Sequence, residues 1–370
     1  MSYTSVSSAN RVRLWVLAGG RCEYRGCNHV LWRDDKTLRW MNKAYIAHIV
    51  ADSPNGPRGD DVRSPLLAND LSNLMLLCDG CHRLIDKVDV AGHPETLLVE
   101  FKREHEQRVE TLTGIQPDLR THVLTFVANI GERKGVVNRD DALQAVVPAR
   151  HPDPRFLEID LTRLSISDDD PGYWNQMRSE VESQLALTLQ PSTGAAHVSS
   201  FALAPIPLLM VFGRKLGDIR EADVFQKFRG GHPWKWRTAG GQRWQVRRAR
   251  RGLDATEVAV AVSVTGLVHA AEVTKALGRQ VPLYRIGVNR RDFDVVCTKQ
   301  MLAEFTKAWR NLLNHIRATH GEDSVAHVFP ATPNSIAVEM GRGLLPKSHP
   351  KLEVWDYQRD SGGYVHALSL

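Results

Sequence analysis

Four cysteines in two close pairs constrain the N-terminal part of this chain more than any other feature. Four residues separate Cys22 from Cys27, and two separate Cys78 from Cys81. Four thiolates in two such knuckles match the ligand number of a closed, tetrahedral structural zinc site. The alternative is four unrelated thiols, which the paired spacing disfavours. The long stretch between the knuckles must then form its own unit, whose ends the zinc ion holds together.

The chain divides into two regions of different composition. Its 370 residues are enough for two domains, and cysteine pairs are confined to the part before Gly114. A helical pattern opens at Pro94 and closes at Gly114, and a short linker follows. We therefore expect domains at residues 1–116 and 117–370. The polar N-terminus and the short apolar runs predict a cytoplasmic protein without a membrane span.

Charge and hydrophobic patterning restrict the second region. The net charge of +6 permits a polyanionic partner without requiring one. From residue 122 onward, β-like runs alternate with helical patterns, first over residues 123–189 and again over residues 257–329. This alternation predicts an α/β fold with two successive halves. The alternative is one larger α/β domain.

A constellation of polar residues lies between and after the cysteine knuckles. Residues 43–50 read as a strand carrying His48 near its end, and residues 71–78 read as a second strand that includes Asn73. A helix then carries His82 and Asp86, four residues apart on one face, where an imidazole and a carboxylate can converge on one divalent cation. The simpler alternatives are a packed structural histidine at position 48 and an exposed ion pair on the helix.

This order of residues resembles the HNH nuclease family. His48, Asn73 and His82 occupy the strand, strand, helix order of its ββα-metal fold, and residues 56–59 form a Gly-Pro-Arg-Gly loop seen in many relatives. The resemblance implies that His48 is the general base, that Asn73 holds the loop carrying it, and that His82 and Asp86 bind a catalytic Mg²⁺ ion. It implies that the first domain is an α+β, zinc-bound endodeoxyribonuclease.

Two features of this resemblance stay open. Many HNH nucleases carry a further metal ligand just before the catalytic histidine, where this chain has Ala47. Either water and phosphate complete the metal shell, or Asp52 contributes. Arg58 and Arg83 are candidates for contacts with DNA phosphates, and the alternative is that both are solvated surface cations.

Two segments of the second region are candidates for ligand binding. Residues 229–237 interleave aromatic and cationic side chains, and a basic run continues to residue 251, a mixture that can stack a base and pair with phosphate. Its candidate contacts are Trp234, Lys235, Trp236 and Arg237. The alternative is a half-buried hairpin with a solvated basic face. Near the C-terminus, a strand over residues 325–329 feeds a helix expected from about Ile336, which suits an anionic nucleotide. Its candidate contacts are Thr332, Asn334 and Ser335.

Residues 329–342 and 352–357, the strand at 260–266 and the Trp234-x-Trp236 pair resemble the SAVED domain. The resemblance implies an α/β domain of two Rossmann-like, CARF-like halves that binds a cyclic oligonucleotide. The HNH plus SAVED order resembles the effector nuclease of bacterial cyclic-oligonucleotide anti-phage signalling systems (CBASS). It implies a ligand, more specifically a cyclic dinucleotide, that drives homo-oligomerisation and non-specific degradation of double-stranded DNA.

Two other functions remain as alternatives at this point. One is a restriction-type HNH nuclease whose C-terminal domain reads DNA directly. The other is a zinc-stabilised nucleic-acid-binding regulator with an inactive nuclease site, a hypothesis that Ala47 supports and the retained His48, Asn73, His82 and Asp86 oppose. The sequence leaves open the identity of the ligand, the size of the oligomer and any cleavage preference.

Overall fold

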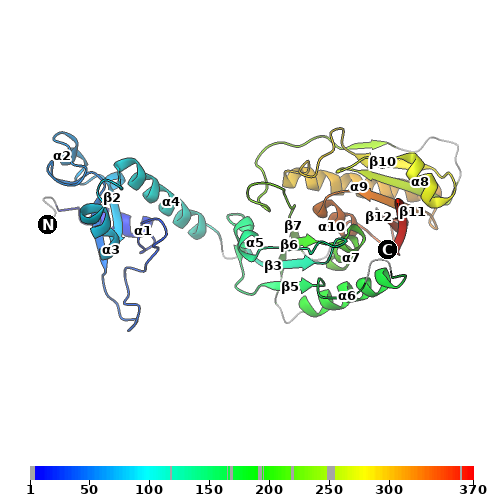
Figure 1. Cartoon of the computed structure of the whole chain (residues 1–370), viewed down its shortest axis with the longest axis horizontal. Coiled ribbons are helices and arrows are strands. Elements are labelled where there is room, and N and C mark those ends of the chain that lie inside the picture. Colours follow the sequence, from blue (N-terminus) through cyan, green and yellow to red (C-terminus); the bar gives the residue numbers. More distant parts are fainter. Residues whose placement is uncertain are drawn as a thin grey trace. The chain divides into compact units, whose positions relative to one another are not determined.

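The computed structural model describes residues 5–116, 119–164, 166, 170–190, 194, 196–217, 221–247, 255–358 and 361–370. The chain forms two compact units, Met1–Gln116 and Pro117–Leu370, called unit 1 and unit 2 below (Figure 1). Part of the basic run considered above, Arg248, Arg250 and Arg251, lies outside the described residues.

Unit 1 is built around an antiparallel hairpin. β1 (Ala44–His48) pairs with β2 (Leu74–Cys78), and His48 lies opposite Leu74. α3 (Asp79–Arg83) follows β2 directly and continues into a π-helical turn, η2 (Leu84–Val88). The observed second strand is shorter than the expected range of residues 71–78, because η1 (Leu71–Asn73) forms a 3-10 turn before it. The strand, strand, helix order is as expected.

Three further helices surround the hairpin: α1 (Ser8–Leu17), α2 (Arg63–Leu67) and α4 (Glu95–Thr113). The Ser7 side chain caps α1 by accepting a hydrogen bond from the Asn10 backbone N–H. The run Leu74–Leu77 is fully buried, since β2 is covered on both faces. The hairpin that carries the candidate site residues therefore lies in the core of unit 1.

Unit 2 contains two sheets. The first has the strand order β4-β3-β6-β7, with β5 also paired to β3, and all of its pairings are parallel. Its elements are β3 (Arg120–Val127), α5 (Arg139–Val146), β4 (His151–Pro152), β5 (Leu157–Asp160), α6 (Tyr173–Thr188), β6 (His197–Leu203), α7 (Ile206–Leu216) and β7 (Glu221–Val224).

The second sheet has the order β13-β12-β11-β9-β10-β8, with parallel pairing in the middle and antiparallel pairing of β13 and β8 at the edges. Its elements are β8 (Gln245–Arg247), β9 (Glu257–Ser263), α8 (Ala270–Leu277), β10 (Leu283–Gly287), α9 (Lys299–His320), β11 (Val325–Ala331), α10 (Asn334–Arg342), β12 (Lys351–Gln358) and β13 (Gly363–Ser369). Two α/β halves were expected, and each sheet forms the centre of one.

The two halves join through α7 and α10. A Cβ atom on Gly213 would lie 2.0 Å from the Val338 carbonyl oxygen, and one on Gly341 would lie 2.0 Å from the Met210 oxygen. Only glycine permits such close backbone contact. One hydrophobic core contains residues of both sheets, including Phe126 and Val260, so unit 2 behaves as one packed body.

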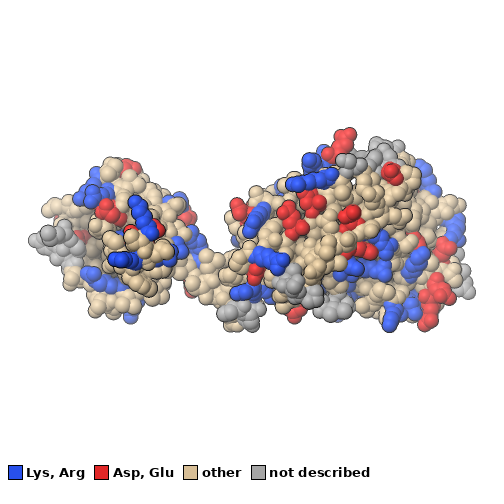
Figure 2. Space-filling model, turned by 90° about the horizontal axis from the view of Figure 1, so that it is seen from below, with Lys and Arg blue, Asp and Glu red and all other residues tan. Residues whose placement is uncertain are grey.

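Two further properties of the fold are the distribution of charge on its surface and the hydropathy of its helices. On the face in Figure 2, Lys and Arg side chains are interspersed with Asp and Glu side chains over both units. The net positive charge therefore forms no single continuous patch on this face. Among the residues that the structure describes, no helix has both the length and the apolar character needed to cross a bilayer.

Candidate functional site

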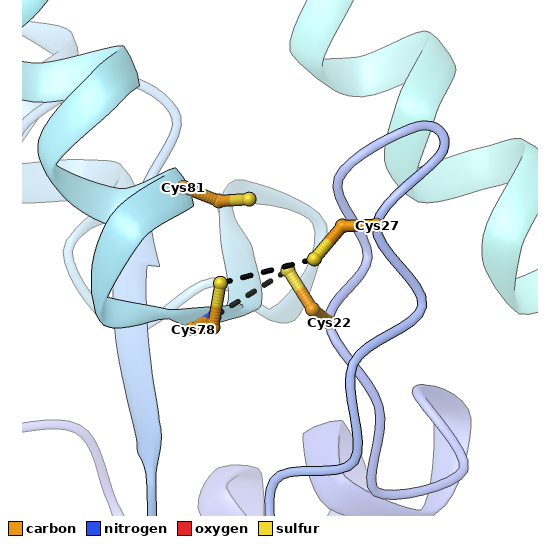
Figure 3. A group of neighbouring side chains, drawn as sticks. All are labelled: Cys22, Cys27, Cys78 and Cys81. Carbon is orange, nitrogen blue, oxygen red and sulfur yellow. Dashed lines mark hydrogen bonds between the residues drawn. The ribbon is translucent and has the colours of Figure 1, made fainter.

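The four predicted zinc ligands lie together (Figure 3). Cys22 and Cys27 come from the loop after α1, whereas Cys78 and Cys81 come from the junction of β2 and α3. Their sulfur atoms all lie within 4.8 Å of one another, and 3.8 Å separates Cys27 Sγ from Cys78 Sγ. Zn–S bonds of about 2.3 Å give a tetrahedron with edges of about 3.8 Å. The cluster therefore has the size of a zinc site.

The electrostatics of this cluster also suit a cation. Burial raises the pKa of Cys22 to about 12. Burial, together with the charges of neighbouring thiol groups, raises the pKa of Cys81 as well. A bound cation supplies the positive charge that buried thiolates need. The donor set therefore fits a resident Zn²⁺ ion.

His48 ends β1 with its side chain largely buried. Its Nε2 lies 2.9 Å from the backbone oxygen of Ala68. Because a carbonyl oxygen can only accept, Nε2 carries a proton, and in the neutral imidazole the lone pair is then on Nδ1. A lone pair on a held imidazole is what the abstraction of a proton from water requires.

Asn73 holds the segment that follows His48. Its Oδ1 accepts the Val50 N–H at 2.8 Å, and its Nδ2 donates to the oxygens of Val50 and Leu67 at 2.9 and 3.2 Å. Val50 is fully buried and Asn73 nearly so. One amide side chain thus satisfies both backbone groups of a buried residue, two positions after the candidate base.

His82 and Asp86 lie beside each other across α3 and η2. Nε2 of His82 is 3.1 Å from Oδ2 of Asp86, and the imidazole stacks on the Tyr45 ring with 5.1 Å between centroids. Neighbouring ligands in an octahedron with bonds of about 2.1 Å are about 3.0 Å apart. In this structure the two groups contact each other directly, and the same spacing would suit two adjacent positions around one Mg²⁺ ion when Nε2 of His82 carries no proton.

The charge state of Asp86 is compatible with that role. Burial raises the pKa of its carboxyl, but hydrogen bonds from His82 and Arg58 outweigh burial and hold the pKa below its usual value. Asp86 is therefore a carboxylate at neutral pH.

The rest of the metal shell is thin. Ala47 is buried and offers no ligand atom. Within the described residues, the four cysteines are the one group of three or more potential ligands gathered closely enough to hold a metal. Asp52 therefore does not join His82 and Asp86 in such a group of described residues.

The two candidate DNA-contacting arginines differ. The Arg58 side chain is only 8% exposed and pairs with Asp86, with 2.7 Å between Nη2 and Oδ1. The prediction that Arg58 contacts DNA phosphates is wrong for this structure, because its guanidinium is buried and engaged within the protein. Arg83 is 64% exposed and pairs with Asp79, so it stays accessible to a phosphate.

In unit 2, Trp234 departs from its predicted role in base stacking. Its indole is fully buried and lies edge-on to Phe201, with 5.2 Å between the ring centroids. Lys227 Nζ lies 5.2 Å from the centroid of the same ring. Burying this large apolar ring stabilises the first half of unit 2, so it offers no open face to a ligand.

The neighbouring candidates remain nearer the surface. Lys235 and Arg237 are exposed, and Trp236 is half-buried. Nη2 of Arg237 lies 3.3 Å from Oδ2 of Asp294. The Trp236 indole nitrogen is buried and has no hydrogen-bond partner among the described residues. Cationic contacts by Lys235 and Arg237 therefore stay possible in geometric terms.

The start of α10 also corrects the sequence prediction. The helix begins at Asn334 rather than about Ile336, with Pro333 in the capping position. The Asn334 side chain does not cap the helix, because it bonds to backbone groups of the first half: Ala202 within β6, and Phe225 and Lys227 after β7. It holds the two halves together.

Ser335 and Thr332 are similarly enclosed. Ser335 is fully buried and its Oγ donates to Oε1 of Gln226 at 2.6 Å. Thr332 is also buried, and its Oγ1 has no hydrogen-bond partner among the described residues. The predicted ligand contacts of Asn334 and Ser335 are therefore not supported, because both side chains are used within the protein.

A basic pocket missed by the sequence analysis lies at the carboxyl ends of β9 and β10 and at the start of α8. Its volume is about 320 Å³, at the lower end of the range for small-molecule sites. Its polar lining includes Ser263, His269 and three arginines, Arg247, Arg285 and Arg291, and none of the described lining residues is acidic. Burial and the charges of the other two arginines lower the pKa of Arg285. The pocket therefore suits an anion.

The residues that line this pocket are distant in sequence, and the pairing of their strands in the sheet makes them neighbours. Arg247 lies opposite Arg285 in the antiparallel β8–β10 pair, whereas Ser263 and Gly287 are neighbours at the ends of parallel strands. The sequence feature that could have indicated this pocket is the apolar run at residues 257–264 followed by His269 and Glu272. These two residues form a capping box at the start of α8.

Comparison with known proteins identifies the C-terminal part. Residues 181–370, just over half of the chain, match the family described as "SMODS-associated and fused to various effectors sensor domain", or SAVED. No curated protein matches the chain. Among solved structures, the Cap4 SAVED/CARF-domain containing receptor of Acinetobacter baumannii with the cyclic trinucleotide 3'3'3'-cAAA is 12% identical, with a TM-score of 0.48.

The match to that receptor covers 74% of this chain and 59% of the receptor. The corresponding receptor of Moraxella osloensis is 12% identical with a TM-score of 0.45, over 75% of this chain and 58% of that one. This chain thus spans about three fifths of the length of the structures it matches. The expectation of an α/β SAVED sensor domain is confirmed for residues 181–370.

Proposed function

Since this chain belongs to the SAVED family of sensor domains, we propose that unit 2 binds a cyclic oligonucleotide and thereby activates a metal-dependent endonuclease in unit 1. The observation that carries the nuclease half of the proposal is the hydrogen bond from His48 to Ala68, which leaves Nδ1 of His48 as a base. The signalling context is bacterial anti-phage defence, in which degradation of double-stranded DNA kills or arrests the infected cell.

The sensor half of the proposal is supported by the family and by the basic pocket. Arg247, Arg285 and Arg291 gather positive charge, with no acid among the lining residues that the structure describes. A phosphate of a cyclic oligonucleotide would relieve their mutual repulsion. A pocket of about 320 Å³ at strand ends and a helix start accommodates one nucleotide unit of such a ligand.

In unit 1, we assign the steps of phosphodiester hydrolysis to residues already described. His48 takes the proton of the attacking water at Nδ1 and keeps its orientation through Nε2 and Ala68. Asn73 keeps the following segment in place. His82 and Asp86 would hold a divalent cation, which supplies stabilisation of the charge on the phosphate and leaving oxygens when bound. The four cysteines would hold Zn²⁺ as a structural ion.

Activation requires a difference between two states. The ligand must bind the active assembly more tightly than the free chain, because equal affinity for both would shift nothing. We propose that ligand-driven homo-oligomerisation is this change and that it brings nuclease units together on DNA. Unliganded protein is then nearly inactive.

Plasmid cleavage tests the proposal. Purified protein with Mg²⁺ is incubated with plasmid, alone and with each of a panel of cyclic di- and trinucleotides. We expect degradation with one panel member and none without ligand. Cutting without any ligand would instead favour the restriction-type nuclease. Absence of cutting with every panel member, alongside unchanged sedimentation, would refute activation by this ligand class.

A matched pair of variants tests the base assignment. His48→Ala is expected to abolish cleavage and to leave ligand binding intact. His29→Ala is the control, because His29 is an exposed histidine of unit 1 that pairs with Asp35 at the surface. Cleavage by His48→Ala at the wild-type rate would remove His48 from the mechanism.

A further inference from the structure

The Arg58 side chain makes four hydrogen bonds within unit 1. Its Nε donates to the Ile49 carbonyl oxygen at 2.6 Å, and its Nη1 donates to the Ile85 and His93 oxygens at 2.9 and 3.4 Å. Its Nη2 donates to Oδ1 of Asp86 at 2.7 Å. Four of the five guanidinium N–H groups are therefore used, and the side chain is only 8% exposed.

The loop around Arg58 is shaped to deliver this side chain. Arg58 has a φ of 56°, in the left-handed region that non-glycine residues seldom adopt. A Cβ on the next residue, Gly59, would lie 2.3 Å from the Pro54 oxygen, so the turn closes on itself. The backbone thus accepts an uncommon conformation that points the guanidinium inward.

The contacts of Arg58 connect the base-carrying segment of the proposed active site with its metal-binding carboxylate. Ile49 directly follows His48, the proposed base. The Ile49 N–H donates a hydrogen bond to the backbone carbonyl oxygen of Asn73. Asp86 is a proposed metal ligand, and Arg58 holds its Oδ1 while Oδ2 faces His82. A planar guanidinium has a fixed geometry, so it sets where the base segment lies relative to the metal-binding carboxylate.

We propose that Arg58 is a positioning residue of the nuclease site, which fixes the base-carrying segment relative to the metal ligands and aims Oδ2 of Asp86 at the cation. This inference rests on the proposed function of unit 1. Groups hydrogen-bonded to metal ligands typically change metal affinity 10- to 100-fold when removed. In this assignment Arg58 does not contact DNA, because its guanidinium is already hydrogen-bonded within unit 1.

The test separates positioning from DNA binding and from stability. Full-length wild-type protein, Arg58→Gln, Arg58→Lys and the control Arg103→Gln are compared; Arg103 is an exposed arginine on α4. Mn²⁺ affinity is measured by electron paramagnetic resonance, without DNA or cyclic nucleotide. DNA affinity is measured in a His48→Ala background, and cleavage is separated into kcat and KM.

For Arg58→Gln we expect Mn²⁺ affinity to fall by about 10- to 100-fold and kcat to fall, while KM and DNA affinity stay near wild type. Arg58→Lys keeps the charge without the planar fork, so it is expected to restore little. If Arg58→Gln fails to fold, the lysine variant carries the same test. Unchanged Mn²⁺ affinity in the folded variant, or a loss of DNA affinity instead, overturns the inference. A wild-type protein that binds no Mn²⁺ contradicts the proposed function itself.

Discussion

Replacing Asn73 with alanine tests how firmly the base-carrying segment is held. The variant leaves the Val50 N–H and C=O, at a fully buried position, without the amide that pairs both of them. Each buried backbone group left unsatisfied costs about 1–3 kcal/mol. Two such groups give a local loss of about 2–6 kcal/mol in the free energy of opening.

Amide hydrogen exchange followed by mass spectrometry measures this loss directly, because it reports local opening without requiring the whole chain to unfold. At 1.4 kcal/mol for each factor of ten, peptides covering β1 and residues 49–51 should exchange roughly 30- to 20,000-fold faster. Peptides from unit 2 should be unchanged. Cleavage should fall with the loss of protection, since a mobile base no longer reaches the attacking water.

Ser72→Ala is the matched control. The Ser72 hydroxyl donates to Asp70 at the surface, next to Asn73 in sequence, and surface changes of this kind are usually within about 0.5 kcal/mol. Wild-type exchange rates around Val50 in Asn73→Ala would refute the reasoning. Equal acceleration in both variants would also refute it, because the effect would then come from η1 as a whole.

Three further predictions concern the zinc cluster, the basic pocket and a buried histidine. Removing zinc with a strong chelator should unfold unit 1 while unit 2 keeps its ligand affinity, as measured by elemental analysis, circular dichroism and calorimetry. Arg285→Gln should weaken cyclic-nucleotide binding at least tenfold, and Arg279→Gln, at an exposed ion pair with Glu257, should not. Burial lowers the pKa of His197 from 6.5 to about 4. The unfolded chain therefore binds the proton first, and stability should fall as pH drops from about 6.5 towards 4. In His197→Gln this part of the pH dependence should disappear from denaturant titrations.

Much of the secondary structure follows from sequence pattern alone. The alternation of strand-like and helical patterns expected over residues 257–329 appears as β9, α8, β10, α9 and β11, because long periodic or β-branched runs bounded by turn residues carry strong local signals. The cysteine cluster was also predictable, since two knuckles of four thiols have few other uses. These features depend on residues close together in sequence or on one ligand chemistry.

The roles of Arg58 and Trp234 could not be predicted in this way. A cation in a glycine-proline loop reads as a surface group, and only the left-handed backbone at residue 58 turns its guanidinium towards Asp86. Trp234 sits among cations in sequence, yet its neighbours in space are Phe201 and Lys227. Where a long side chain ends depends on the tertiary fold, which a one-dimensional pattern does not contain.

The zinc cluster and the proposed catalytic residues share one short stretch of backbone. Asn73 immediately precedes β2, Cys78 ends that strand, and His82 follows Cys81 directly in α3. A cation on the four thiolates would therefore fix the start of the helix that carries His82, while Asn73 fixes the other end of the strand against the base segment. Because α3 is only five residues long, it has little stability of its own. We therefore expect the geometry of the proposed catalytic site to depend on the proposed structural zinc, so that zinc loss abolishes divalent-cation binding at His82 before it affects unit 2.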